Sequence, residues 1–118
     1  MMLKCISIRE PWGSLIREGK KTIETRTWNT KYRGKILLHA SAKPESEISG
    51  KIFAIADLVD CHPMTKEDEE AAQCEIYPKA HSWVLKNVIR TNLMPLKGQL
   101  GLFDVEVELE GFEENDGD

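Results

Sequence analysis

The chain has 118 residues, of which 41% are hydrophobic and 31% are charged. This length suits one domain with its own hydrophobic core, and the composition is typical of a soluble globular protein rather than a disordered one. The longest apolar runs have four or five residues, whereas a membrane-spanning helix needs ~20. We therefore expect no association with a membrane.

The charge is unevenly distributed along the chain. Residues 1–43 carry ten Lys and Arg against three Asp and Glu, whereas residues 44–118 carry six against seventeen, and the net charge is −4. An acidic total argues against non-specific coating of DNA. A basic N-terminal half predicts a positive cleft, although a solvated charged surface would give the same counts. We expect one domain at 1–110, followed by a disordered acidic tail at 111–118.

The three cysteines, Cys5, Cys61 and Cys74, are odd in number and widely spaced. This pattern indicates reduced thiols that pack in the interior. The first residues also lack the long apolar segment of a secretory signal, so we expect a cytoplasmic protein. A zinc site that adds His62 and His81 is the alternative, but its spacing matches no structural zinc pattern. We expect neither a metal nor another cofactor.

The first elements are a strand and a short helix. Residues 3–8 alternate between apolar and polar side chains, which predicts a strand. Pro11 suits the first turn of a helix, and apolar residues recur at helical spacing from Trp12 to Ile16. Gly19 then provides a helix stop.

Two further strands are predicted at 21–26 and 35–40. The second is apolar and should be buried. In the first, strict alternation places Lys21 and Glu24 on opposite faces. These two side chains can then meet only if the strand twists or bulges, or if both reach over its end.

The rest of the chain predicts more strands than helices. Strands are expected at 51–60, 82–85 and 100–109, a helix at 65–74, and an exposed connector at 87–92. The fold class is therefore α+β and mainly β. We expect a small, closed or nearly closed antiparallel β-barrel with two or three short helices, and an open α+β sandwich is the alternative.

Basic and aromatic side chains are interleaved after the third predicted element. Arg26, Lys31 and Arg33 have the chemistry of phosphate recognition, because a guanidinium group forks onto phosphate oxygens. Trp28 and Tyr32 lie among them and could stack on unpaired bases. This pattern favours binding of a single-stranded nucleic acid. A surface loop whose Trp28 covers the end of the barrel is the competing interpretation.

Lys21 and Glu24 form the sharpest chemical pair in the chain. A partly buried Lys21 would have a lowered pKa and could act as a base or activate a nucleophile. An ion network of these two residues with Arg26 is the alternative, and we favour it because no nucleophile partner is evident. Arg9 lies at the helix start, where an anion is favoured. Trp12 belongs with the core but borders the expected cleft.

Several segments, in order along nearly the whole chain, resemble the ASCH domain family. They are residues 6–12, 19–28, 31–34, 38–40, 58–61, 83–85 and 95–103. The resemblance implies a PUA-like β-barrel with a cleft beside the first helix. It also implies binding of RNA or a nucleotide-like ligand, and some members of the family are enzymes.

The family signature Gly-x-Lys-x-x-Glu-x-Arg is met by Gly19, Lys21, Glu24 and Arg26. The subfamily that hydrolyses the acyl group of acetylated cytidine has Thr at the position of Glu24, so this chain departs from that pattern. We expect binding of single-stranded RNA or a modified nucleoside. The alternative is an amidohydrolase or a ribonuclease that uses Lys21 and Glu24 as acid and base. The candidate binding residues are Arg9, Trp12, Lys21, Glu24, Arg26, Trp28, Lys31, Tyr32 and Arg33.

Overall fold

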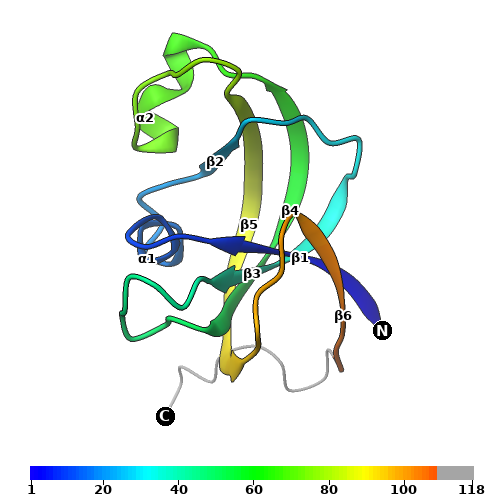
Figure 1. The fold of residues 1–118 in the computed structure, drawn as a ribbon. Helices are drawn as coiled ribbons and strands as arrows, with labels where there is room; N and C mark the ends of the chain where they lie inside the picture. The colour runs from blue at the N-terminus through cyan, green and yellow to red at the C-terminus, as the bar shows by residue number, and fades with distance from the viewer. Residues whose placement is uncertain (109–118) are drawn as a thin grey trace.

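The structure, a computed structural model, describes residues 1–108 as a curved sheet with short helices on one side (Figure 1). The elements in chain order are β1 (Met2–Ile8), α1 (Trp12–Arg17), β2 (Ile23–Arg26), β3 (Gly34–Ala40), β4 (Lys51–Pro63), the 3-10 turn η1 (Lys66–Asp68), α2 (Glu69–Ala72), β5 (His81–Pro95) and β6 (Leu102–Glu106). The acidic segment predicted to be a tail, 111–118, lies outside the described residues.

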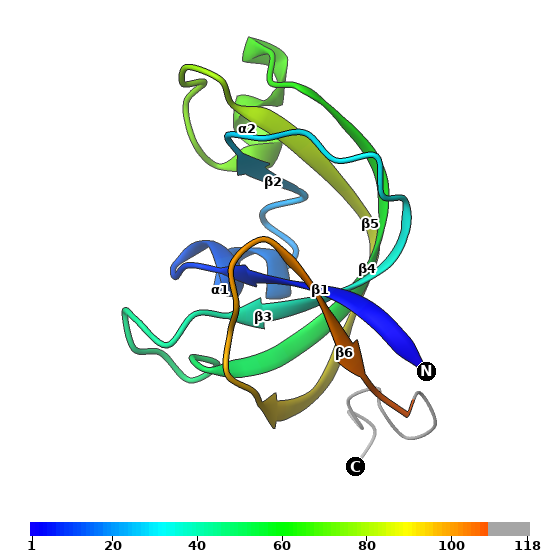
Figure 2. The same ribbon diagram turned by 45° about the vertical axis from the view of Figure 1, so that its right-hand side comes forward.

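The six strands form one sheet in the order β2-β5-β4-β3-β1-β6. Figure 2 shows how far the sheet curls, since β1 and β6 cross in front of β4 and β5. The mainly β, α+β class is confirmed, and the curvature is barrel-like. Among residues 1–108, however, no pairing joins β2 to β6, so the sheet stays open.

One strand pair is parallel rather than antiparallel. β1 pairs with β3 in parallel, with Cys5 opposite Leu37. Parallel neighbours need a crossover connection, and here α1 and β2 lie between them in the chain. This crossover brings the N-terminal end of α1 to the same face as β2, which is where the candidate site lies.

β3 is buried on both faces, as its apolar run predicts. Ile36 and Leu38 belong to the largest core cluster, together with Trp83, whereas Leu37 packs with Phe103 on the other face. All three residues of the run are fully buried, and each contributes about 1.5–3 kcal/mol by removal from water. A third cluster fastens α2 to β2; its buried members are Ile23, Met64, Ala72 and Ala80.

The predicted connector at 87–92 is wrong, because β5 continues through it. Asn87 has a positive φ of 54° and the β4–β5 ladder shifts register at several points. The polar residues of this stretch belong to a strand with one exposed face, and that pattern resembles a loop in sequence. The other elements agree in type but are shorter or longer than expected: β2 begins at Ile23, and Gln73 ends α2 in the left-handed conformation.

No helix within residues 1–108 is long and apolar enough to cross a membrane. The described part of the chain also contains no group of three His, Cys, Asp or Glu placed to hold a metal ion. His62 instead hydrogen-bonds Asp60 and Asp68.

Candidate functional site

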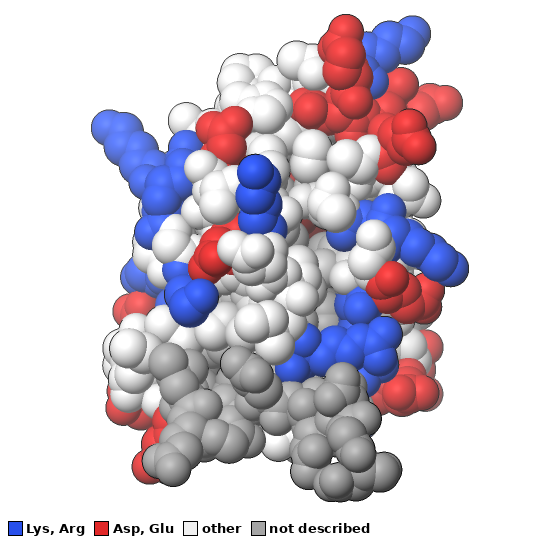
Figure 3. Space-filling view, turned by 180° about the vertical axis from the view of Figure 1, so that it is seen from behind, with Lys and Arg blue, Asp and Glu red and all other residues white. Residues whose placement is uncertain are grey.

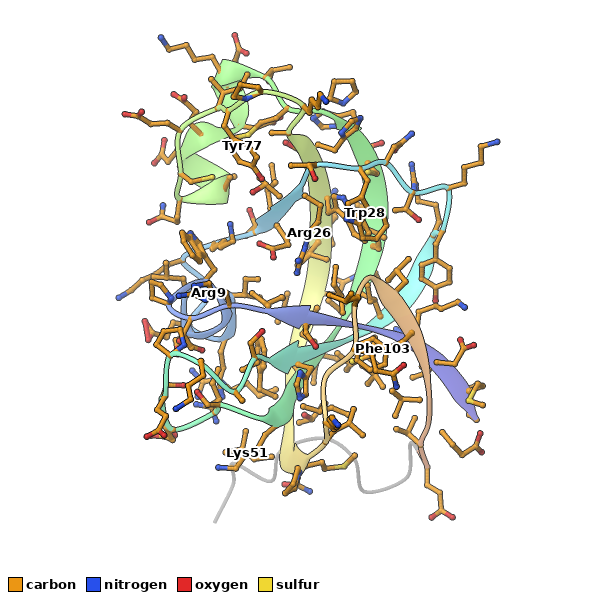
Figure 4. The ribbon with its side chains drawn as sticks, in the orientation of Figure 1. Arg9, Arg26, Trp28, Lys51, Tyr77 and Phe103 are labelled. Carbon is orange, nitrogen blue, oxygen red and sulfur yellow. The ribbon has the colours of Figure 1, made fainter. Side chains whose placement is uncertain are left out.

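A cavity of about 380 Å³ opens between α1, β2 and the segment that follows α2. We call it the β2 cavity. Arg9, Arg26 and Tyr77 lie around β2 on the face shown in Figure 4. The residues that line the cavity are Arg9, Trp12, Lys21, Glu24, Thr25, Arg26, Cys74 and Tyr77.

Lys21 lies just before β2, so strand alternation does not govern its direction. Its backbone N–H donates to the Leu15 carbonyl at 3.1 Å, which fixes it against the end of α1. Its side chain is only 1% exposed, and Nζ donates to the carbonyl of Ala72 in α2. Burial lowers the pKa of Lys21, although the nearby Glu24 carboxylate opposes this shift. The ammonium is therefore held where its charge is costly.

Glu24 lies between two cations. Its Oε1 is 3.5 Å from Lys21 Nζ, and its Oε2 is 3.1 Å from Arg26 Nη2. Glu24 and Arg26 are two residues apart on β2 and so share a face, while Ile23 packs into the core cluster beneath α2. Arg26 also donates to the Ser7 carbonyl. The three charged residues form the ion network that the sequence favoured over a catalytic pair.

Two aromatic side chains, Trp12 and Tyr77, line the cavity together with the network. Trp12 is half-buried at the start of α1 and packs against the main core cluster. Tyr77 lies in the segment between α2 and β5, and its hydroxyl donates to Thr25 Oγ1 at 2.9 Å. The cavity therefore offers flat apolar surfaces beside buried charges. This combination suits a ligand with a ring and polar edges.

Thr25, Cys74 and Tyr77 line the cavity but are not among the residues predicted to bind. Thr25 lies on β2 between two predicted residues, whereas Cys74 and Tyr77 come from another part of the chain. Cys74 was assigned to packing, and Tyr77 falls in a stretch with no periodicity. Both reach the cavity because Thr22 N donates to Ala71 O at 2.9 Å, which holds α2 against the start of β2. No local pattern encodes that contact. The only indication in the sequence was that Tyr77 is the one aromatic residue in the short connector between α2 and β5.

The basic and aromatic loop after β2 lies elsewhere. Trp28 packs edge-on against Trp83, with ring centroids 4.7 Å apart, and the Trp83 indole N–H donates to the Trp28 carbonyl at 3.3 Å. Figure 4 shows Trp28 on the side of Arg26 away from Arg9 and Tyr77, and Trp28 does not line the β2 cavity. Lys31 is exposed. Trp28 thus packs on the core residue Trp83 and stays partly exposed.

Tyr32 and Arg33 make local contacts. The Tyr32 hydroxyl donates to the Lys35 carbonyl, and Arg33 Nη1 donates to the Thr30 carbonyl at 2.9 Å. Arg33 Nη2 also lies 3.9 Å from Asp60. The structure therefore brings Arg9, Trp12, Lys21, Glu24 and Arg26 together, and it leaves the remaining predicted binding residues outside the β2 cavity.

The opposite face of the molecule carries mixed charge (Figure 3). Acidic side chains gather at the end that bears η1 and α2, where Glu67, Asp68, Glu69 and Glu70 fall in the first turns. Basic side chains also gather on this face, in its lower half.

Comparisons with known proteins agree on the fold. The crystal structure of ASCH from Zymomonas mobilis superposes with a TM-score of 0.65 at 15% identity, covering 92% of this chain and 89% of that one. The structure of a point mutant of the same Zymomonas mobilis protein also gives 0.65 at 14% identity, covering 87% and 89%. At such identities the likeness speaks for the fold alone.

Two curated relatives carry the name activating signal cointegrator 1. The human protein is 30% identical over 81 residues and the mouse protein 28%, and each match covers 48% of this chain. The chain spans only 14% of the length of these relatives. The model of the ASCH domain matches residues 6–95, which hold the end of β1, β2 to β5 and both helices. This chain therefore belongs to the ASCH domain family.

Proposed function

We propose that the β2 cavity binds one unpaired nucleotide, either in single-stranded RNA or as a modified nucleoside. The observation that carries this proposal is the convergence of Trp12 and Tyr77 with Arg9, Glu24 and Arg26 on one cavity. Its volume of about 380 Å³ falls within the range of small-molecule sites. The base enters between the aromatic side chains, and the phosphate faces the arginines.

Glu24 gives the site a means to read a base. Each of its carboxylate oxygens faces one cation, and a carboxylate has about four acceptor positions. Lone pairs therefore remain for a base N–H, such as an exocyclic amine. Glu24 is only 7% exposed. A ligand that covers it without donating a hydrogen bond to it should therefore bind more weakly, because a buried acceptor without a partner is unfavourable.

Arg9 and Arg26 supply the phosphate contacts. Arg9 is exposed at the rim, whereas Arg26 is partly buried and held by Glu24 and the Ser7 carbonyl. A guanidinium that is already positioned loses little side-chain entropy when it binds phosphate. Family membership supports the general class of ligand, and the cavity supports a single nucleotide as the unit that is bound.

Fluorescence anisotropy with a short labelled single-stranded RNA tests the proposal. We expect Trp12→Ala and Arg26→Ala each to weaken binding about tenfold, because a stacking or bidentate contact contributes ~1–3 kcal/mol. Lys31→Ala is the matched control for Arg9→Ala, since both residues are exposed cations of the N-terminal half. If Lys31→Ala and Arg9→Ala weaken binding equally, the RNA is held by diffuse charge and the assignment of the cavity is wrong.

A second candidate, hydrolysis of an acylated cytidine or of RNA, is favoured by one observation. The buried Lys21 has a lowered pKa and lies 3.5 Å from Glu24, so a neutral amine is more accessible there than at an exposed lysine. Turnover of N4-acetylcytidine that disappears in Lys21→Ala would favour this candidate. Absence of turnover across acylated nucleosides and RNAs, with binding intact, would leave the binding function alone.

A further inference from the structure

A second cavity, of about 540 Å³, lies beside the first. It is bounded by the ends of β1 and β3 and by the segment 96–101, which crosses in front of the sheet between β5 and β6 (Figure 1). We call it the loop cavity. Its lining includes Ser7, Arg26, His39, Gly98 and Leu100.

Arg26 is shared between the two cavities. Its Nη2 is 3.1 Å from Glu24, which faces the β2 cavity, and it donates to the carbonyl of Ser7, which lines the loop cavity. A guanidinium has five N–H donors. A phosphate that binds Arg26 can therefore lie between one part of a ligand in the β2 cavity and another part of the same ligand in the loop cavity.

The floor of the loop cavity is polar and ordered. His39 is only 1% exposed, and its Nε2 donates to the Leu96 carbonyl at 2.6 Å. Its Nδ1 lies 2.9 Å from Ser7 Oγ. Since a carbonyl can only accept, Nε2 carries a proton, and in the tautomer protonated at Nε2 alone Nδ1 accepts a hydrogen bond from the Ser7 hydroxyl. Ser7 Oγ then keeps lone pairs with which it can accept an N–H or O–H from a ligand.

Gly98 lets the loop close over this floor. A Cβ built at Gly98 would lie 2.6 Å from Ser7 Oγ and 3.0 Å from His39 Cε1. Real Cβ atoms do not approach so closely, so only glycine permits the backbone to pass there. The loop, the serine and the histidine thus form one built surface.

Leu100 adds an apolar face at the mouth of the cavity. Its side chain is 98% exposed, and the next residue, Gly101, has a positive φ of 67° that turns the chain back into β6. A lone exposed leucine is ordinary on a surface. Here it lines a cavity with polar groups below and an arginine at one side, an arrangement that suits the covering of a flat base.

We propose that the loop cavity is a second nucleoside subsite, so that the domain binds two successive nucleotides of a single strand with their connecting phosphate on Arg26. One base lies in the β2 cavity and the next lies under Leu100, with Ser7 as an acceptor for its edge. This inference rests on the proposed function of the β2 cavity.

Binding of dinucleotides and mononucleotides to the full chain tests this inference by calorimetry. The probes are the four homodinucleoside monophosphates and the matching nucleoside 5′-monophosphates. A nucleoside monophosphate carries up to two negative charges near neutral pH, whereas a dinucleoside monophosphate carries one. Charge alone would favour the mononucleotide. We instead expect the dinucleotide to bind about tenfold more tightly, because one more base is covered.

Leu100→Ser is expected to remove the tighter binding of the dinucleotide and to leave the affinity for the mononucleotide unchanged. Ile89→Ser is the matched control, because Ile89 is also an exposed aliphatic residue and does not line either cavity. Equal affinities for mono- and dinucleotides, with both weakened by Trp12→Ala, would overturn the second subsite and leave the first intact. A dinucleotide advantage that survives Leu100→Ser would overturn its location. Failure of both ligand types to bind would overturn both proposals.

Discussion

Lys21 shows why the direction of a side chain in the candidate site could not be predicted from the sequence. The residue lies outside β2, its backbone is fixed by α1, and its Nζ donates to a carbonyl of α2. Alternation within a strand predicted that Lys21 and Glu24 diverge, yet Nζ and Oε1 are 3.5 Å apart. The sequence could identify the charged types but not their direction, because that direction is set by contacts with residues far along the chain.

Replacing Lys21 by methionine should destabilise the fold. The variant keeps an apolar stem but leaves Glu24 paired with Arg26 alone, and the Ala72 carbonyl loses its donor. We expect the free energy of unfolding to fall by about 1–3 kcal/mol, the cost of leaving a buried polar group unsatisfied. Urea denaturation measures this. Lys20→Met, at an exposed neighbour, should change stability little, and equal effects of the two variants would show that the network does not contribute.

The contacts of Trp28 could not be predicted from the sequence either. Its aromatic ring and its basic neighbours predicted a stacking residue, and the alternative was a cover for the barrel end. The edge-on contact with Trp83 joins residues that are far apart in sequence, so composition alone could not choose between the two. Stacking of a base on its exposed edge stays a prediction that Trp28→Ala can test by RNA binding.

At the scale of elements, regular hydrophobic patterns were predictable and irregular ones were not. The apolar run of β3 and the helical spacing of α1 correspond to the structure. β5 was interrupted in the prediction because its middle is polar, although it pairs with β4 along its length. The segment that carries Cys74 and Tyr77 has no period to detect. Its place is fixed by packing of α2 under β2.

A histidine links the end of β4 to η1. His62 Nδ1 lies 2.7 Å from Asp60 Oδ2, and Nε2 lies 2.9 Å from Asp68 Oδ2. Asp68 also accepts from the Thr65 backbone N–H and from the Ser82 hydroxyl. Because both ring nitrogens face carboxylates, the protonated ring is favoured. Hydrogen bonds to Asp60 and then Asp68 raise the pKa of His62.

This link predicts a pH dependence of stability. With a folded-state pKa above the unfolded value of about 6.5, His62 stabilises the fold fully below that value, and the contribution is lost as pH rises through the folded-state pKa. The difference in unfolding free energy between the wild type and His62→Gln should therefore shrink from pH 6 upward. His81→Gln, which alters a histidine outside this cluster, is the control. A difference that stays constant with pH would contradict the link.

For the whole molecule, the uneven charge of the sequence has a spatial counterpart. The β2 cavity takes its three cations from the basic N-terminal half, and of its lining only Cys74 and Tyr77 come from the acidic half. The positive cleft is thus small, and acidic side chains surround α2 nearby. Binding should be local rather than spread along a strand.

The salt dependence of binding measures how local it is. For single strands, the slope of log affinity against log salt concentration is about −0.7 for each phosphate neutralised. We expect a slope near that of one or two phosphates, and no increase when the RNA is lengthened from four to twelve nucleotides. A slope that grows with RNA length would indicate a continuous basic track instead.

Arg26 belongs to both cavities, and this has a thermodynamic consequence. A ligand in one cavity that orders the Arg26 guanidinium makes binding in the other cavity more favourable. Linkage makes this effect reciprocal: the factor by which the first ligand improves the affinity for the second equals the factor by which the second improves the affinity for the first. A nucleoside monophosphate and a separate nucleoside added together should thus affect each other's affinity equally, and the effect should be small because Glu24 and the Ser7 carbonyl already hold the guanidinium.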